Sequence, residues 1–137
     1  PLRWRAAPRD YGAADLSRHE ALAVPGDYNI APGIDDTHDP DYWEGNILCS
    51  DQERDAFQAL LDLGLTDSFR LFEHPEKTFS WWDYRKLGFQ LNKGLRIDHV
   101  LVSEVLRKAC TACAVDRAPR KLERPSDHAP VTAEFDR

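Results

Sequence analysis

The chain has 137 residues, 42% of them hydrophobic and four of them tryptophan, which suits one globular domain and excludes a disordered chain. No apolar run approaches the ~20 residues of a membrane span. Three cysteines without a visible secretory signal favour reduced thiols and a cytoplasmic location. The net charge of −6 argues against polyanion binding by the whole surface, but the excess of bases in residues 85–124 could still contact phosphates.

Residues 1–20 show no clear hydrophobic period, apart from a pattern at Ser17–Leu22 that is compatible with the end of a helix. The first clear element is a strand at Ala21–Asn29. Alternation along this strand places Asp27 and Asn29 on one face. Carboxylate and amide oxygens are ligands that suit Mg²⁺ or Mn²⁺. The alternative is a plain turn, because Gly, Asp, Tyr and Asn in this order also suit a turn.

A loop and a helix come next. Residues 31–49 are rich in Pro, Gly and Asp, and His38 lies among aspartates without the spacing of a calcium-binding loop, so a solvated acidic loop is favoured. Ser50–Glu53 has the form of a capping box, and the apolar spacing that follows predicts a helix closed at Gly64. We expect this helix to pack against the core, and we assign no catalytic residue to it.

The second half of the chain alternates short strands and loops. We expect a strand at 78–82, a polar loop at 83–93, a strand at 95–102, a one-turn helix from Ser103, a strand at 109–115, a basic loop at 117–124 and a final strand from Ala129. Strands mixed with short helices predict an α/β or α+β fold. Cys110 and Cys113 would point to opposite faces of their strand. We therefore expect them to pack as small apolar side chains and not to form a metal or redox site.

Asp98 is the acid most in need of a partner. Alternation along Leu95–Val102 places Arg96 and Asp98 on one face and His99 on the other. A carboxylate on a packing face needs a hydrogen-bond donor, and His128 is the natural candidate. Such a bond would raise the pKa of the imidazole, so that a protonated ring could contact a phosphate. The alternative is a buried pair that only joins two strands.

Two common catalytic signatures are missing from the sequence. No serine lies in a nucleophile elbow, and no glycine-rich phosphate-binding motif occurs. Acids beside Asn and His at three predicted strand edges therefore favour metal-assisted attack of water on phosphorus.

Four stretches form recognisable motifs: GDYNIAP at 26–32, FSWWDYR at 79–85, GLRIDH at 94–99 and PSDHAPV at 125–131. In this order and spacing they resemble exonuclease III, the apurinic/apyrimidinic endonuclease branch of the endonuclease/exonuclease/phosphatase superfamily. Residues 21–137 form the family-like part of one domain, and residues 1–20 are a lead-in that matches poorly.

The resemblance implies the C-terminal half of a four-layer α/β sandwich, with one mixed β-sheet flanked by helices. The family's first half supplies an early Asn, the Glu that is the main metal ligand and a catalytic Tyr, and none of these precedes Ala21. We therefore expect a fragment whose partner is the missing N-terminal half of the same protein. Alone, it should be nearly inactive and should expose Val and Leu side chains on one sheet face.

The family pattern also implies roles for the site residues. Asp27 would activate water or protonate the leaving group, and Asn29 would orient the phosphate. Asp127, with Asp27 and Asn29, would form the site for Mg²⁺ (or Mn²⁺). His128, paired to Asp98, would bind the scissile phosphate.

Contacts to DNA follow from the same resemblance. Trp81, Trp82 and Leu95 would form an apolar wall against the deoxyribose of an abasic site. Independently of the resemblance, the basic residues near these aromatic residues in the sequence could contact backbone phosphates: Arg85, Lys93 and Arg96. The alternative for the two tryptophans is a core pair, with at least one of them buried.

The implied function is Mg²⁺-dependent hydrolysis of DNA 5′ to abasic sites, with 3′-to-5′ exonuclease trimming, in DNA repair. The substrate would be duplex DNA with an abasic site, and no membrane partner is expected. Two alternatives stay open: another phosphatase or RNA-directed nuclease of the superfamily, and a truncated module without catalytic activity.

Overall fold

The computed structural model describes residues 20–136, and these adopt the predicted α/β fold class. The helix end predicted at residues 17–22 lies mostly outside the described residues. The strands are β1 (Ala23–Asp27), β2 (Thr66–Asp67), β3 (Trp81–Trp82), β4 (Gly94–Leu95), β5 (Asp98–Val102), β6 (Cys110–Val115) and β7 (Val131–Phe135). The α-helices are α2 (Pro40–Trp43), α3 (Asp51–Leu61) and α4 (Glu104–Ala109), and the 3₁₀ helices are η1 (Ile34–Asp36), η2 (Ser68–Leu71), η3 (Arg85–Leu87) and η4 (Ala118–Lys121).

The strands of residues 20–136 form three small antiparallel sheets, in the orders β1-β5-β2, β3-β4 and β6-β7, rather than the expected single mixed sheet. The strand predicted at 95–102 is broken between β4 and β5. At the break the Arg96 N–H donates to the Asp36 carbonyl (2.8 Å) instead of to a neighbouring strand. The chain therefore leaves one sheet and enters the next within two residues.

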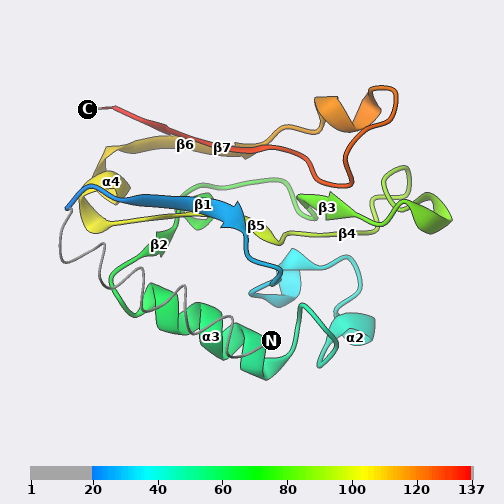
Figure 1. The fold of residues 1–137 in the computed structure, drawn as a ribbon, viewed down its shortest axis with the longest axis horizontal. Coiled ribbons are helices and arrows are strands. Elements are labelled where there is room, and N and C mark those ends of the chain that lie inside the picture. Colours follow the sequence, from blue (N-terminus) through cyan, green and yellow to red (C-terminus); the bar gives the residue numbers. More distant parts are fainter. Residues whose placement is uncertain (1–19, 137) are drawn as a thin grey trace.

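Strand β5 lies at the centre of the fold and is covered on both faces (Figure 1). Leu101 packs with Phe57 and Leu60 of α3 on one face. Val100 and Val102 pack on the other face, against Leu106 of α4 and the apolar side chains of β7. In Figure 1 α3 and the β6–β7 pair accordingly lie on opposite sides of β1 and β5.

Helix α3 begins as its sequence predicts. The Ser50 hydroxyl accepts a hydrogen bond from the Glu53 N–H (3.2 Å), which satisfies one of the free amide groups of the first turn. The Glu53 carboxylate accepts from the Leu48 N–H (3.1 Å). The loop before the helix is thereby bonded to its first turn.

A buried ion cluster around Arg96 joins the acidic loop to the sheets. The Arg96 side chain is 1% exposed, and its Nε and Nη2 each lie 2.7 Å from a carboxylate oxygen, of Asp36 and Asp67 respectively. Its Nη1 donates to His99 Nδ1 (3.0 Å), and the His99 Nε2–H donates to the Ile30 carbonyl (2.8 Å). Burial, together with the neighbouring guanidinium, lowers the pKa of His99 to about 4, so this ring is neutral.

The apolar sheet face that we expected to be bare is not seen among residues 20–136. Their exposed large apolar side chains all lie in loops and short helices: Ile34, Tyr42, Ile47, Tyr84, Leu87, Leu91, Val105 and Leu122. The physical reason is that α3 and the β6–β7 pair cover the two faces of β5.

The three cysteines are free thiols; Cys49 and Cys113 are buried and Cys110 is half-buried. Burial raises the pKa of the Cys113 thiol, which suits a small apolar role better than nucleophilic chemistry. No helix within residues 20–136 is both long and apolar enough to cross a membrane.

Replacing Arg96 by alanine should lower the free energy of unfolding by about 3–5 kcal/mol, because Asp36 and Asp67 would lose their shared cation inside the protein. Urea unfolding followed by tryptophan fluorescence measures this loss. Arg107→Ala is the matched control, since it removes an arginine that pairs with Glu104 on the surface and should leave the midpoint nearly unchanged. Equal small losses in both variants would contradict a structural role for the cluster.

Candidate active site

Asp27 ends β1 directly opposite Asp98 of β5, so the strand register alone brings these two carboxylates together. Asn29 lies beyond the strand in a left-handed conformation (φ 51°), and its N–H donates to Asp27 Oδ1 (2.9 Å). The prediction that Asp27 and Asn29 share a strand face is therefore wrong; the turn alternative is only partly right, because Gly26 and Asp27 still belong to β1 and the chain turns only after Asp27. Asn tolerates this conformation better than most residues do, and the turn fixes the Asp27 side chain.

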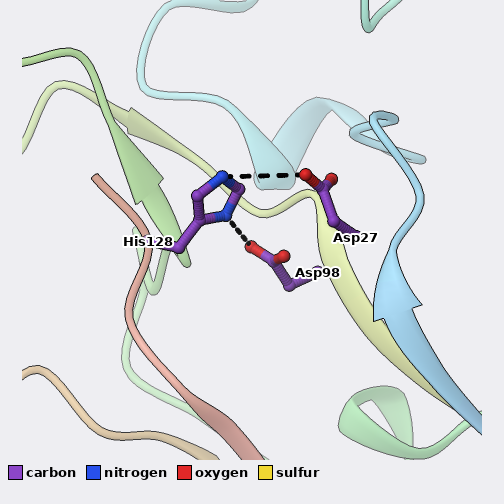
Figure 2. Close-up of side chains that lie close together, drawn as sticks. All are labelled: Asp27, Asp98 and His128. Atoms are coloured by element: carbon purple, nitrogen blue, oxygen red, sulfur yellow. Dashed lines mark hydrogen bonds and ion pairs between the residues drawn. The ribbon is translucent and has the colours of Figure 1, made fainter. Parts of the chain in front are cut away.

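The hydrogen bond predicted between His128 and Asp98 is present (Figure 2). His128 Nδ1 lies 2.8 Å from Asp98 Oδ2, and it must carry the proton because a carboxylate only accepts. The other ring nitrogen, Nε2, lies 3.6 Å from Asp27 Oδ2 and 3.8 Å from Asp127 Oδ1. Three predicted carboxylates thus converge around the imidazole of His128.

Ser80 explains how segments thirty residues apart meet at this point. Its fully buried hydroxyl accepts from the backbone N–H groups of Ile97 (3.0 Å) and Asp98 (3.1 Å). Its own N–H donates to the Leu95 carbonyl (3.0 Å), and its carbonyl accepts from the Ala129 N–H (2.8 Å). Sequence reasoning did not identify Ser80, because a single serine next to a strand carries no distinctive pattern.

The electrostatics of the site follow from these distances. The hydrogen bond to Asp98 raises the pKa of His128 above its ordinary value, with a further contribution from Asp27 and Asp127 and against the effect of burial. Burial raises the pKa of Asp27, and the negative charges of Asp98 and Asp127 add to this rise, while the Asn29 N–H and His128 oppose it. The imidazole of His128 and the carboxyl of Asp27, which lie side by side, therefore both bind a proton more readily than usual.

The donor set fits a hard divalent cation. Ligand atoms of Asp27, Asp98 and His128 lie within 4.8 Å of one another. Carboxylate oxygens are the preferred ligands of Mg²⁺, and a cation here would offset the negative charges of Asp98 and Asp127, which add to the rise that burial causes in the pKa of Asp27. Asp127 offers a further carboxylate, one oxygen of which accepts from Trp81 Nε1 (3.0 Å). The predicted ligand set of Asp27, Asn29 and Asp127 stays a prediction.

Comparison with known proteins identifies the family. A model described as "Endonuclease/Exonuclease/phosphatase family" matches residues 2–128. The chain belongs to this family. The resemblance to exonuclease III is confirmed by 41% identity over 135 residues to the exodeoxyribonuclease III of Haemophilus influenzae, covering 93% of this chain and 50% of that protein.

Two solved structures of the endonuclease/exonuclease/phosphatase fold are close in shape. A 3′ phosphatase from Neisseria, bound to a product DNA hairpin, is 49% identical with a TM-score of 0.95, over 98% of this chain and 52% of that one. An AP endonuclease from Archaeoglobus fulgidus is 33% identical with a TM-score of 0.90, over 98% of this chain and 53% of that one. The chain thus spans about half the length of the relatives that it matches.

Three of the predicted DNA contacts are corrected by the structure. Trp82 and Leu95 are 0% exposed and Arg96 is 1% exposed. Trp82 belongs to the core, as the alternative foresaw, and its Nε1 donates to Asn92 Oδ1 (3.0 Å). Leu95 lies in a cluster against which Trp81 packs, and Arg96 is held by its buried carboxylates.

The other predicted contacts are accessible. Trp81 is half-buried beside the site, and the Arg85 side chain is 84% exposed, with an ion pair to Asp83 (2.8 Å). Lys93 is also exposed. These three residues remain predicted contacts for DNA.

The raised pKa of His128 sets the sign of a pH dependence. The pair with Asp98 stabilises the fold fully below the ordinary His pKa of 6.5, and this contribution is lost as the pH rises through the raised folded-state pKa. We expect the unfolding free energy to fall between pH 6 and pH 9 by about 1 kcal/mol more in the wild type than in Asp98→Asn.

Urea unfolding of both proteins at the two pH values measures this difference, and groups common to both cancel in the comparison. Glu134→Gln, an exposed acid on β7, is the control and should keep the wild-type pH dependence. An identical pH dependence in the wild type and Asp98→Asn would show that the charged pair of Asp98 and His128 does not stabilise the fold.

Proposed function

We propose that this chain is part of a DNA-repair phosphodiesterase that hydrolyses DNA 5′ to abasic sites and trims 3′ ends with Mg²⁺ (or Mn²⁺). The observation that carries the proposal is the Asp27–His128–Asp98 constellation in a chain of the endonuclease/exonuclease/phosphatase family. Similarity to an exodeoxyribonuclease III and to an AP endonuclease supports the choice of DNA as substrate.

His128 would bind and neutralise the scissile phosphate. Asp98 accepts the Nδ1 proton and raises the pKa of the ring, which favours a second proton on Nε2, 3.6 Å from Asp27 Oδ2. A phosphate oxygen beside the ring would accept from Nε2–H in place of Asp27. Such a donor strengthens its interaction as negative charge develops on the phosphate, which is the condition for lowering the barrier.

Asp27 would move the proton of the reaction. Its raised pKa suits a group that takes a proton from water or returns one to the leaving oxygen. Asp27, Asn29 and Asp127 would hold Mg²⁺, which supplies charge neutralisation at the phosphoryl oxygen. Because the chain spans about half the length of its relatives, the activity is proposed for the protein completed by its N-terminal half.

The substrate side of the site would be formed by Trp81, with Arg85 and Lys93 further out. Trp81 is fixed by its hydrogen bond to Asp127, so its ring could form the apolar wall for a deoxyribose beside the reacting phosphate. A second candidate function is removal of 3′-terminal phosphates, favoured by the 49% identity to a protein described as a 3′ phosphatase.

In the completed protein, Asp27→Asn and His128→Asn should each lower the rate on a duplex with one abasic site by ~10²–10⁴, because each removes a proton-transfer or phosphate-stabilising group. Lys108→Gln, a surface change on α4, is the control and should keep the wild-type rate. Retention of full activity by either site variant would remove the proposed role.

The substrate class is tested with the same protein on three oligonucleotides of one sequence: an abasic duplex, a duplex with a 3′-phosphate and an RNA strand. The proposal expects Mg²⁺-dependent cleavage of the abasic duplex as the fastest reaction. Faster release of phosphate from the 3′ end supports the second candidate, cleavage of the RNA alone assigns an RNA-directed nuclease, and no reaction on any of them assigns a module without catalytic activity.

A further inference from the structure

Arg120, in the 3₁₀ helix η4, is a buried cation close in sequence to the candidate active site. It is 7% exposed. Its guanidinium carbon lies 4.7 Å from the centre of the Phe89 ring, 5.5 Å from that of Tyr84 and 5.7 Å from that of Trp82. These three rings form an aromatic cage around the group, and cation–π attraction holds it there.

One hydrogen bond explains why an arginine occupies this cage. Arg120 Nη1 donates to the Ser126 carbonyl (2.9 Å), whereas the buried Nε has no hydrogen-bond partner within residues 20–136. Burial of a guanidinium with an unsatisfied donor is costly, and an apolar side chain would fill the same space at a lower cost. The donor to Ser126 is the contribution that an apolar side chain could not make.

Ser126 begins the turn that carries two of the site residues, Asp127 and His128. The Ser126 hydroxyl accepts from the His128 N–H (3.1 Å), so the turn is closed by a hydrogen bond of its own. The Asp127 carbonyl accepts from the Trp82 N–H (3.1 Å). Arg120 and Trp82 therefore bind the turn at two successive carbonyls, and a shift of Ser126 would move the His128 ring as well.

We infer that Arg120 is a positioning residue, whose bond to the Ser126 carbonyl sets the place of the His128 ring beside Asp98 and Asp27. The inference deepens the proposed function and rests on it, because it gives Arg120 a part in the same reaction. The aromatic cage encloses the guanidinium, so Arg120 acts through the turn and not on the substrate. Its loss should therefore slow the chemical step and leave the binding of DNA nearly unchanged.

The sign of a pKa change separates positioning from a simple effect of charge. The bond to Asp98 raises the pKa of His128, so a displaced ring should titrate closer to its ordinary value of 6.5. Loss of a positive charge acts in the opposite direction, because a neighbouring cation disfavours the imidazolium. A fall in the pKa of His128 on removal of Arg120 is therefore explained by displacement and not by the lost charge.

NMR titration of the His128 ring in the 137-residue chain measures this change. The pKa should fall toward 6.5 in Arg120→Met, which keeps an apolar stem in the cage but removes the donor. It should stay near the wild-type value in Arg120→Lys, whose ammonium can still donate to Ser126. Arg117→Met is the matched control, because this exposed arginine stacks on the same Phe89 ring (4.7 Å), and here the pKa should not fall.

Kinetics of the completed protein test the consequence for the reaction. On an abasic duplex with Mg²⁺, Arg120→Met should lower kcat by about 10- to 100-fold with KM within about twofold of the wild type, and Arg120→Lys should restore most of kcat. A raised KM with unchanged kcat would assign Arg120 to DNA binding and overturn the inference. An inactive wild type contradicts the proposed function alone, because the titration requires no DNA.

A measurement on the unmodified chain applies even where a variant does not fold. The Nη protons of Arg120 should give separate NMR signals, because the bond to Ser126 and the aromatic cage hinder rotation of the guanidinium, whereas those of the exposed Arg117 should average. Averaged signals for Arg120 would overturn the inference. So would a pKa of His128 that stays equally raised in a folded Arg120→Met protein.

Discussion

One buried serine connects the chain segments that form the candidate active site. The Ser80 hydroxyl binds two successive amide groups at the start of β5, and its backbone binds the segments on either side, at Leu95 and at Ala129. Buried amides without a partner cost about 1–3 kcal/mol each, so the hydroxyl fixes where Asp98 begins its strand. The bond to Ala129 then fixes the residue next to His128. Because β1 pairs with β5, the position of Asp27 follows from the same constraint.

On the other side of β5, the Arg96 cluster likewise holds distant segments of the chain together. It binds Asp36 and Asp67, two acids of the most negatively charged part of the chain, inside the protein. Through His99 it also contacts the Ile30 carbonyl, just beyond the Asp27–Asn29 turn. The acidic half of the chain is thus used partly for internal structure, whereas the basic residues after Tyr84 mostly face solvent. The acids of the interior network are paired with Arg96 and Arg70, so its charges balance within the protein.

The sequence predicted those features that depend on local pattern or on a specific motif. Ser50 marked the start of α3, alternation held within β5, and the need of Asp98 for a donor led to His128. Features that depend on distant partners were not predictable in the same way. Alternation failed at Arg96, because its partner Asp36 lies 60 residues away and redirects the backbone.

Exposure was the least predictable property of the site. Two neighbouring tryptophans look alike in sequence, yet Trp82 is buried under Phe89 and the stacked arginines while Trp81 remains beside the site. The family motif identifies which residues matter, but only packing decides which of them reach solvent. The same reasoning explains why Leu95 and Arg96, both inside a family motif, lie in the core.

We conclude that Ser80 holds Asp98 against His128. The most direct measurement is the NMR titration of the His128 ring in the wild type, in Ser80→Ala and in Ser80→Thr, which keeps the hydroxyl. We expect the raised pKa of His128 to fall toward 6.5 in Ser80→Ala, although Asp98 and His128 are both still present, and to remain raised in Ser80→Thr. A pKa that stays equally raised in a folded Ser80→Ala protein would contradict the claim.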